Sequence, residues 1–438
     1  MRPVLASGLS KGTFLALALA TLTSASAQDR SLTLAQAIDL AKRRNGTIQA
    51  AILDVASAKS RVRETFGAFL PSVIPSYEYD TRRSELFTGP FRGRSGDVTH
   101  STQVAANWRI LDSGQREWAY QASRRSAEAT AASASQTLRS ILFTVNQQFF
   151  DALRAQELLR VASAQVERAS KIQDQTQAQI DVGAAAKKDI LQVRADRLNA
   201  EVSRLSAENQ SSITEASLKA TIGFEEKEEL GNLVAEAEPS SFPEPESLEE
   251  AIKSGLAQRP DLVALRKRRD AQQYFVRTAE REATYTWTLD ATLSRSFSEE
   301  VSDFRGLTFL VSLPLFDGHR SKEAARQQRL ALMAQDAELV QAEREARADI
   351  ESAHALLRQD IRRVAAAKLA KEAAQLNYDA ALESQRLGAE GTDIITVLTA
   401  QVSLVTAESN YVEALYDYFI SDVRLKLVTG RTMPGETS

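Results

Sequence analysis

Apolar and polar residues alternate with a period of two in four stretches of the chain, which is the pattern of β-strands. Two of these stretches lie in the first half, at 73–80 and 103–110. The polar segment between them, 81–97, contains Gly, Pro and Arg and predicts a loop. We therefore expect a first β-hairpin over about residues 72–111.

The other two alternating stretches lie in the second half, at 285–294 and 307–315, with a short acidic segment between them. They predict a second hairpin over about residues 285–315. In both hairpins one strand face is apolar and the other carries Thr, Ser, Gln, Asn and Asp. A sheet with lipid on one side and water on the other needs this pattern, and so does a two-sided sheet in a soluble domain.

Each hairpin leads into a long run without Gly or Pro, Gln115–Val182 and His319–Leu387. Both runs are rich in Ala, Gln, Arg, Glu and Leu, which are strong helix formers. They predict long helices over about 114–182 and 319–387. At about 1.5 Å per residue each helix is on the order of 100 Å long, which no compact globular domain needs.

The same series of elements occurs twice along the chain. Leu34–Ile38 reads L-x-x-A-I and opens the first series, and Leu248–Ile252 repeats this pattern at the start of the second. A turn and a shorter return helix close each series, over about 189–222 and 393–428. The period is too long for a solenoid repeat, so it indicates an internal duplication whose two copies build one object.

The N-terminal residues have the pattern of a signal peptide. Arg2 and Lys11 supply the positive region, Phe14–Leu22 the short apolar core, and Ala25–Ala27 the small-residue cleavage site. The units that we expect along the chain are a signal peptide (1–27), a first repeat (28–223), a connector or equatorial segment (224–247), a second repeat (248–430) and a C-terminal tail (431–438).

Composition narrows the functional classes. The 438 residues include no Cys, so an exported form has no disulfide framework and no lipid-modified cysteine. A formal net charge of −4 gives no reason to expect nucleic acid as a partner. Beyond the signal peptide no apolar run reaches the ~20 residues of a membrane-spanning helix, so membrane insertion would have to use the strands.

The chain shows no catalytic constellation and no cofactor motif, so we do not expect an enzyme. His100, His319 and His354 have neither metal-ligand spacing nor a partner for nucleophilic catalysis. No Gly-rich phosphate loop is present. Acidic residues on the helices read as solvated faces with i, i+4 partners.

Four strands raise the question of how their sheet is closed. An open four-stranded sheet in lipid would expose unpaired backbone groups at both edges. The smallest membrane barrels have about eight strands, so one chain cannot close one. An oligomer can, and three copies would supply twelve strands.

Three short motifs, together with the repeat, resemble the TolC-type outer-membrane factor family over nearly the whole mature chain. They are the doubled L-x-x-A-I, the strand-to-helix motif Pro314–Gly318, and the second helix turn Leu387–Ile394. The resemblance implies a mainly α fold with transmembrane β: a long coiled-coil helical barrel joined to a 12-stranded trimeric β-barrel, four strands per protomer. It places the homotrimer in the outer-membrane lipid of a Gram-negative bacterium, with a periplasmic extension.

The resemblance further implies a passive exit duct of a tripartite efflux pump or a type I secretion system. Such a duct is coupled to an inner-membrane transporter through a periplasmic adaptor. The alternative reading is a structural or adaptor-type periplasmic coiled-coil protein. Drugs, metals and polypeptides all remain open as cargo, because the pump selects the cargo.

In the family the two helix turns form the periplasmic tip, where the adaptor binds and the duct closes. Asp393 is our candidate for a ring of carboxylates at that mouth, and helix N-capping is the alternative role for Asp189 and Asp393. Lys187 and Lys188 precede Asp189 at this tip, and pairing with carboxylates of neighbouring helices is the alternative role for them. The candidate tip residues are Gly183, Lys187, Lys188, Asp189, Gly388, Thr392 and Asp393.

The barrel-to-tunnel junctions are expected to be architectural. Pro314 cannot donate a ladder hydrogen bond, which suits a strand end. Asp317 is placed to cap the long helix, and Gly318 to let the backbone turn. Asp112 and Gly114 are the corresponding residues of the first repeat.

Overall fold

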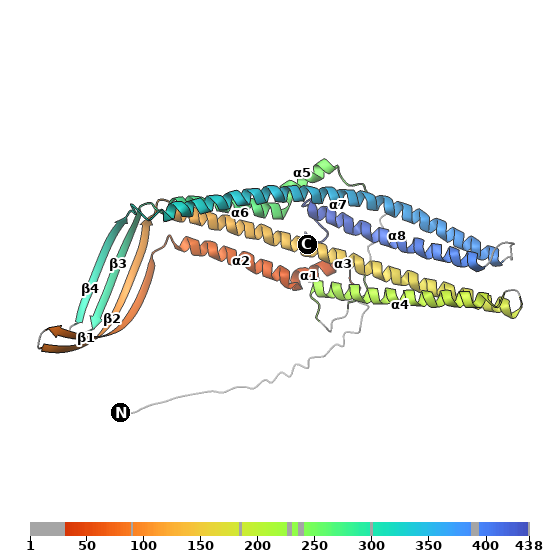
Figure 1. Ribbon diagram of the computed structural model, residues 1–438, viewed down its shortest axis with the longest axis horizontal. Coiled ribbons are helices and arrows are strands. Elements are labelled where there is room, and N and C mark those ends of the chain that lie inside the picture. Colours follow the sequence, from red (N-terminus) through yellow and green to blue (C-terminus); the bar gives the residue numbers. More distant parts are fainter. Residues whose placement is uncertain are drawn as a thin grey trace, which may run out of the picture.

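The computed structural model describes residues 31–88, 91–183, 186–225, 230–234, 241–297, 301–386 and 394–436, so the predicted signal peptide lies outside the described residues. The molecule is elongated, with a curved β-sheet at one end and long helices lying side by side over the rest of its length (Figure 1). The predicted mainly α fold with one four-stranded sheet and an internal repeat is confirmed.

One antiparallel sheet holds all four strands in the order β1-β2-β3-β4. The strands are β1 (Ser72–Thr88), β2 (Phe91–Leu111), β3 (Thr286–Phe297) and β4 (Val301–Ser312). The hairpins from the two repeats meet through β2 and β3, with Val104 opposite Leu293. Because β1 and β4 lie at the edges, each leaves one row of backbone hydrogen-bonding groups unpaired within the described chain.

The loop predicted over 81–97 is wrong. The first hairpin continues through this segment until Thr88 pairs with Phe91. Backbone pairing satisfies N–H and C=O groups whatever the side chains are, so a polar, Arg-rich composition does not end a ladder that is already in register. The second hairpin departs less from its predicted bounds: β4 ends at Ser312, just before Pro314, and not at Leu315.

Two helices of 67 residues, α3 (Gln115–Asp181) and α7 (Arg320–Arg386), run from the sheet to the far end of the molecule. The return helices α4 (Asp189–Ile222) and α8 (Ile394–Val428) pack antiparallel against them, and α3 also packs against α8. Near the sheet, α2 (Gly46–Gly67) and α6 (Pro260–Glu280) take the corresponding places. No described helix is long and apolar enough to cross a bilayer.

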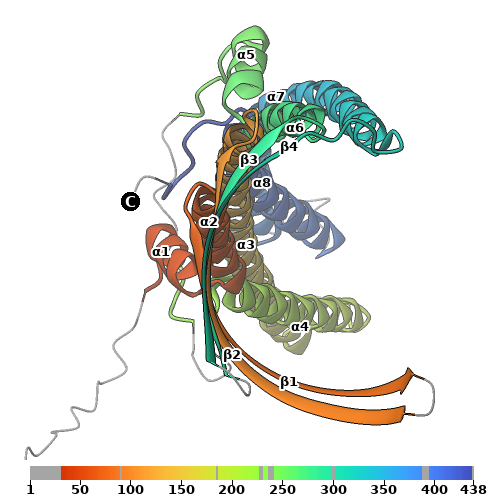
Figure 2. The ribbon, with the colours of Figure 1, turned by 90° about the vertical axis from the view of Figure 1, so that its left-hand side faces the viewer.

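The densest core lies about halfway along the rods, where α1 (Leu34–Arg44) covers α3 and α4. Ile38, Leu142, Phe149 and Met433 are almost fully buried there. On the other side, α5 (Leu248–Gln258) packs on α7. Figure 2 shows α1 and α5 standing outside the arc of long helices.

Buried Arg139 of α3 ties the C-terminal segment to this core. The residue is 4% exposed, and its guanidinium donates to the carbonyl oxygens of Lys426, Gly430 and Arg431 and to the Glu436 carboxylate. A cation from another helix thus satisfies one carbonyl in the last turn of α8 and two just beyond it, which also suits the helix dipole.

Candidate functional site

From the rods to the level of Leu293, the sheet has one mainly apolar and one mainly polar face. Because directly opposed residues of an antiparallel sheet share a face, the register sorts the side chains. On the apolar side the rings of Trp287 and Phe309 pack edge to face, with 5.6 Å between their centroids. On the polar side the Asn107 amide donates to Asp290. Exposed apolar side chains on the first face are Val73, Tyr77, Val104, Trp108, Leu293, Leu307 and Val311.

The apolar face has the height that a bilayer needs. From Trp287 to Arg295 the strand β3 advances eight residues, roughly 26 Å at about 3.3 Å per residue. A strand tilt of about 40° makes this roughly 20 Å along the membrane normal, close to the ~25 Å apolar band of outer-membrane barrels. The exposed aromatic side chains are therefore accounted for by lipid contact.

The first strand-to-helix junction is held by a buried ion pair. Asp112 is 2% exposed, and its Oδ2 lies 2.7 Å from Nε of Arg116. The Arg116 guanidinium also lies over the Phe69 ring. Its remaining donors reach three backbone carbonyl oxygens at the ends of α2 and β2, those of Ala68, Arg109 and Ile110.

The turn itself uses left-handed backbone. Ser113 and Gly114 have φ of 56° and 85°, and α3 starts at the next residue. The Ser113 hydroxyl donates to the Tyr285 carbonyl oxygen at 3.3 Å, which links the junction to the start of β3.

The second junction has the same turn with fewer supports. Gly318 and His319 both have φ of 68°, and α7 starts at Arg320. The Ser321 amide donates to Asp317 Oδ2 at 3.0 Å, so the predicted capping interaction is present. This hydrogen bonding, from the Ser321 side chain first, lowers the pKa of Asp317 below its usual value. Leu315 and Phe316 remain 91% and 79% exposed.

At the far end of α3 and α4 the chain reverses in a short exposed turn. Gly183 follows Val182 with a φ of 77°. Lys187 and Lys188 are exposed, and no carboxylate of a described residue lies within ion-pair distance of either, so the expected pairing is not found. Asp189 is the first residue of α4, and the N-cap position is Lys188, which makes no capping bond. The capping interpretation of Asp189 is therefore wrong.

The second turn carries our other tip candidates. Gly388, Thr392 and Asp393 lie outside the described residues, which resume at Ile394. The described end of α7 lies beside the start of α8, level with the α3–α4 turn (Figure 1). The described ends of α3, α4, α7 and α8 therefore lie at the same end of the molecule.

A charge network that sequence reasoning did not find connects three rods at mid-length. Arg154 of α3 contacts Asp151 at 2.5 Å and Asp417 of α8 at 2.9 Å. Asp417 also pairs with Arg363 of α7 at 2.7 Å. Asp151, Arg154 and Asp417 border a cavity of ≈ 450 Å³ between α3, α4 and α8. Burial raises the pKa of Asp151, and the nearby Asp417 adds to this while Arg154 opposes it.

In the part of the chain that the structure describes, no three His, Asp or Glu side chains converge as metal ligands. His100 lies in the sheet, 2.7 Å from the Tyr77 hydroxyl. His354 Nε2 donates to the Glu246 carbonyl oxygen, and burial lowers the pKa of this imidazole. This histidine therefore fastens the connector to α7.

Comparisons with known proteins agree with this architecture. The family model described as "Outer membrane efflux protein" matches residues 37–224 and 251–431, one block per repeat. The outer membrane protein TolC of Vibrio cholerae serotype O1 is 24% identical over 431 residues, which are 95% of this chain and 94% of that protein.

Two further proteins show the same likeness. The outer membrane efflux protein BepC of Brucella suis biovar 1 is 26% identical over 285 residues, 63% of this chain and 60% of that protein. The crystal structure of the Campylobacter jejuni CmeC outer membrane channel superposes with a TM-score of 0.78 at 17% identity, over 92% of this chain and 86% of that one. The sheet, rods, doubled series and family match together show that the chain belongs to the outer membrane efflux protein family, with its sheet in the outer membrane and its helices in the periplasm.

Proposed function

We propose that this protein is one protomer of a homotrimeric exit duct, through which a pump in the inner membrane expels its cargo across the outer membrane. The observation that carries this proposal is the open sheet: an apolar face of bilayer height with two unpaired edges, β1 and β4. Lipid cannot satisfy those backbone groups, and edge-to-edge pairing of three copies would close twelve strands.

The rods support lateral association. The outward face of α4 carries apolar side chains that are about half exposed or more, at spacings of three, four, seven and eight residues, which keeps them on one side of a helix. They are Leu191, Leu198, Val202, Leu205 and Ile213. Such a stripe is typical of a helix that packs against another chain.

The periplasmic tip is the proposed docking site of an adaptor. The exposed Lys187 and Lys188 beside the exposed Val182 offer a basic and apolar surface. In the same proposal three Asp393 carboxylates ring the mouth, where like charges repel each other and attract cations. The chain carries no energy-coupling site among its described residues, so the inner-membrane transporter supplies the energy and selects drugs, metals or polypeptides.

Fractionation and cross-linking test the proposal. We expect the protein in outer membranes, released only by detergent, and cross-linked to trimers in intact cells. The double substitution Leu198→Asp/Val202→Asp should abolish the trimer band, whereas Ser203→Asp, exposed on another side of α4, should keep it. Recovery of the wild-type protein from the periplasm without detergent would contradict the duct and support a soluble coiled-coil adaptor.

Electrical recordings test the mouth. Asp393→Ala should change single-channel conductance or relieve block by divalent cations in planar bilayers, because it removes the proposed carboxylate ring. Currents unchanged in both respects would leave Asp393 with no role in the duct opening. Drug, metal and secretion phenotypes of a deletion strain then identify the cargo class.

A further inference from the structure

Two arginines and an aspartate interrupt the apolar face where the four-stranded part of the sheet ends, away from the rods. Across the sheet, Tyr77, Thr102, Arg295 and Asp303 form one directly paired row, and Pro75, Val104, Leu293 and Arg305 form the next. Both rows lie on the face that carries Trp287 and Leu307. Charged side chains are therefore placed where lipid is expected.

The position of these charges along the strands is specific. Arg295 ends the apolar band that Trp287 begins, and the next row brings Tyr79 and His100 together at a ring separation of 4.9 Å. Aromatic girdles of this kind mark the edge of the hydrocarbon layer. Because the rods extend into the periplasm, this edge belongs to the outer leaflet.

The three charges do not neutralise one another. Arg295 and Asp303 form a two-pronged pair, with N–O distances of 2.6 and 2.8 Å. Arg305 makes no hydrogen bond or ion pair with any described residue. Two guanidinium groups against one carboxylate leave one positive charge in excess, with a planar set of donors free on Arg305.

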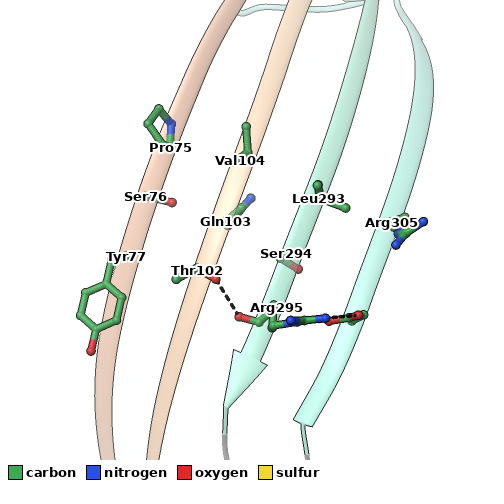
Figure 3. Close-up of a pocket in the computed structure, with 11 residues that line it drawn as sticks. Pro75, Ser76, Tyr77, Thr102, Gln103, Val104, Leu293, Ser294, Arg295 and Arg305 are labelled. Carbon is green, nitrogen blue, oxygen red and sulfur yellow. Dashed lines mark hydrogen bonds and ion pairs between the residues drawn. The ribbon is translucent and has the colours of Figure 1, made fainter. Parts of the chain in front are cut away.

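These side chains border a hollow of ≈ 550 Å³, and Leu293 and Val104 form part of its apolar wall (Figure 3). The hollow combines what a lipid headgroup and the start of its chains require: free cationic donors at the rim and aliphatic surface below. Lipid-facing residues stay exposed when barrel strands close edge to edge, so an assembled barrel would leave this surface accessible.

We propose that the Arg295–Asp303–Arg305 cluster binds a phosphate of the outer-leaflet glycolipid, lipopolysaccharide, with Arg305 as the principal donor, while Asp303 occupies two donors of Arg295. A fork of N–H donors matches phosphate oxygens, and charge-assisted bonds of this type are the strong ones. The proposal rests on the outer-membrane location and not on export, so failure of the proposed duct leaves it intact.

The test titrates the full-length mature protein in detergent with diphosphoryl lipid A and counts bound lipid by native mass spectrometry. Arg305→Gln should weaken binding about tenfold or more, because a charged hydrogen-bond donor is lost. Arg305→Lys should retain part of the affinity. Arg109→Gln removes an exposed arginine from the other face at the opposite end of the band, and it should bind as wild type does.

The substitution Asp303→Asn distinguishes a phosphate-binding role of the cluster from a purely structural role of the Arg295–Asp303 ion pair. It raises the excess positive charge, so phosphate binding should strengthen even where the protein becomes less stable. Unchanged or weaker binding by Asp303→Asn, with circular dichroism showing a folded protein, would overturn the proposal. Equally strong binding of phosphate-free lipid A would also overturn the proposal. Equally strong binding of phosphatidylglycerol would overturn the assignment to the outer-leaflet glycolipid.

Discussion

The two strand-to-helix junctions share a backbone and differ in how side chains support it. Each has two consecutive residues of positive φ, Ser113 and Gly114 in the first and Gly318 and His319 in the second. Each has an aspartate that contacts the residue four positions on. In the first junction that residue is Arg116 and the pair is buried; in the second it is Ser321 and the contact is only partly buried.

Position in the sheet explains the difference. The first junction follows β2, an inner strand, and packs between the end of α2 and the start of β3. The second follows β4, an edge strand, so one flank has no neighbour in the described chain. Both repeats have thus kept the turn, whereas a buried ion pair and hydrogen bonds to neighbouring elements support it only in the first repeat. In the proposed trimer the exposed Leu315 and Phe316 would meet the next protomer.

Of the changes considered for the two junctions, removing Arg116 should lower the free energy of unfolding the most. Arg116→Met leaves the Asp112 carboxylate buried without its ion-pair partner, which typically costs about 3–5 kcal/mol. Urea unfolding of the detergent-solubilised protein should show a correspondingly lower free energy of unfolding. Arg320→Met, at the exposed start of α7, is the matched control and should change stability little. Equal effects of the two substitutions would show that the first junction is not specially braced.

The glycines should test the feature that the junctions share. Gly114→Ala and Gly318→Ala each force a side chain into left-handed backbone, at about 1–2 kcal/mol each. A Cβ at Gly318 would meet nothing within 4 Å, and at Gly114 it would lie 3.4 Å from the Trp118 indole nitrogen. Similar losses in unfolding free energy are expected, slightly larger for Gly114. A neutral Gly318→Ala would mean that the second turn does not keep this backbone.

The smallest effect concerns Asp317. Its pKa is lowered in the folded chain, so the ionised carboxylate stabilises the first turn of α7 above the ordinary pKa of 3.8, and this support is lost as pH falls through the lowered value. At neutral pH Asp317→Ala should speed hydrogen exchange of the Ser321 amide, with a smaller loss of stability than Arg116→Met. Unaltered exchange at Ser321 would show that the cap contributes nothing.

Local pattern was enough to predict the rods and the number of strands. Runs without Gly or Pro mark α3 and α7, and alternation marks all four strands, because both signals act within a few residues. The same reasoning placed the first hairpin correctly but made its two strands too short, since pairing across 81–97 depends on the ladder already formed and not on composition.

Long-range partners were beyond that reasoning. Nothing near Arg139 in the sequence points to carbonyl oxygens at the end of α8, almost 300 residues later. Arg116 offered a local signal, an arginine four residues after Asp112, but only packing shows that the pair is buried. At the tip, pairing with carboxylates was the alternative role for Lys187 and Lys188, and the turn leaves both side chains in solvent.

The equal length of α3 and α7 has a consequence for how the molecule changes in evolution. Both helices have 67 residues, and both start at the sheet and run to the same end. One inserted residue moves everything beyond it by about 1.5 Å and turns it by about 100°, which would misplace every packed side chain. Insertions are tolerated best in steps of about seven residues, matched in both helices and their return partners. The reach of this protein from the membrane is therefore adjustable only in whole packing periods.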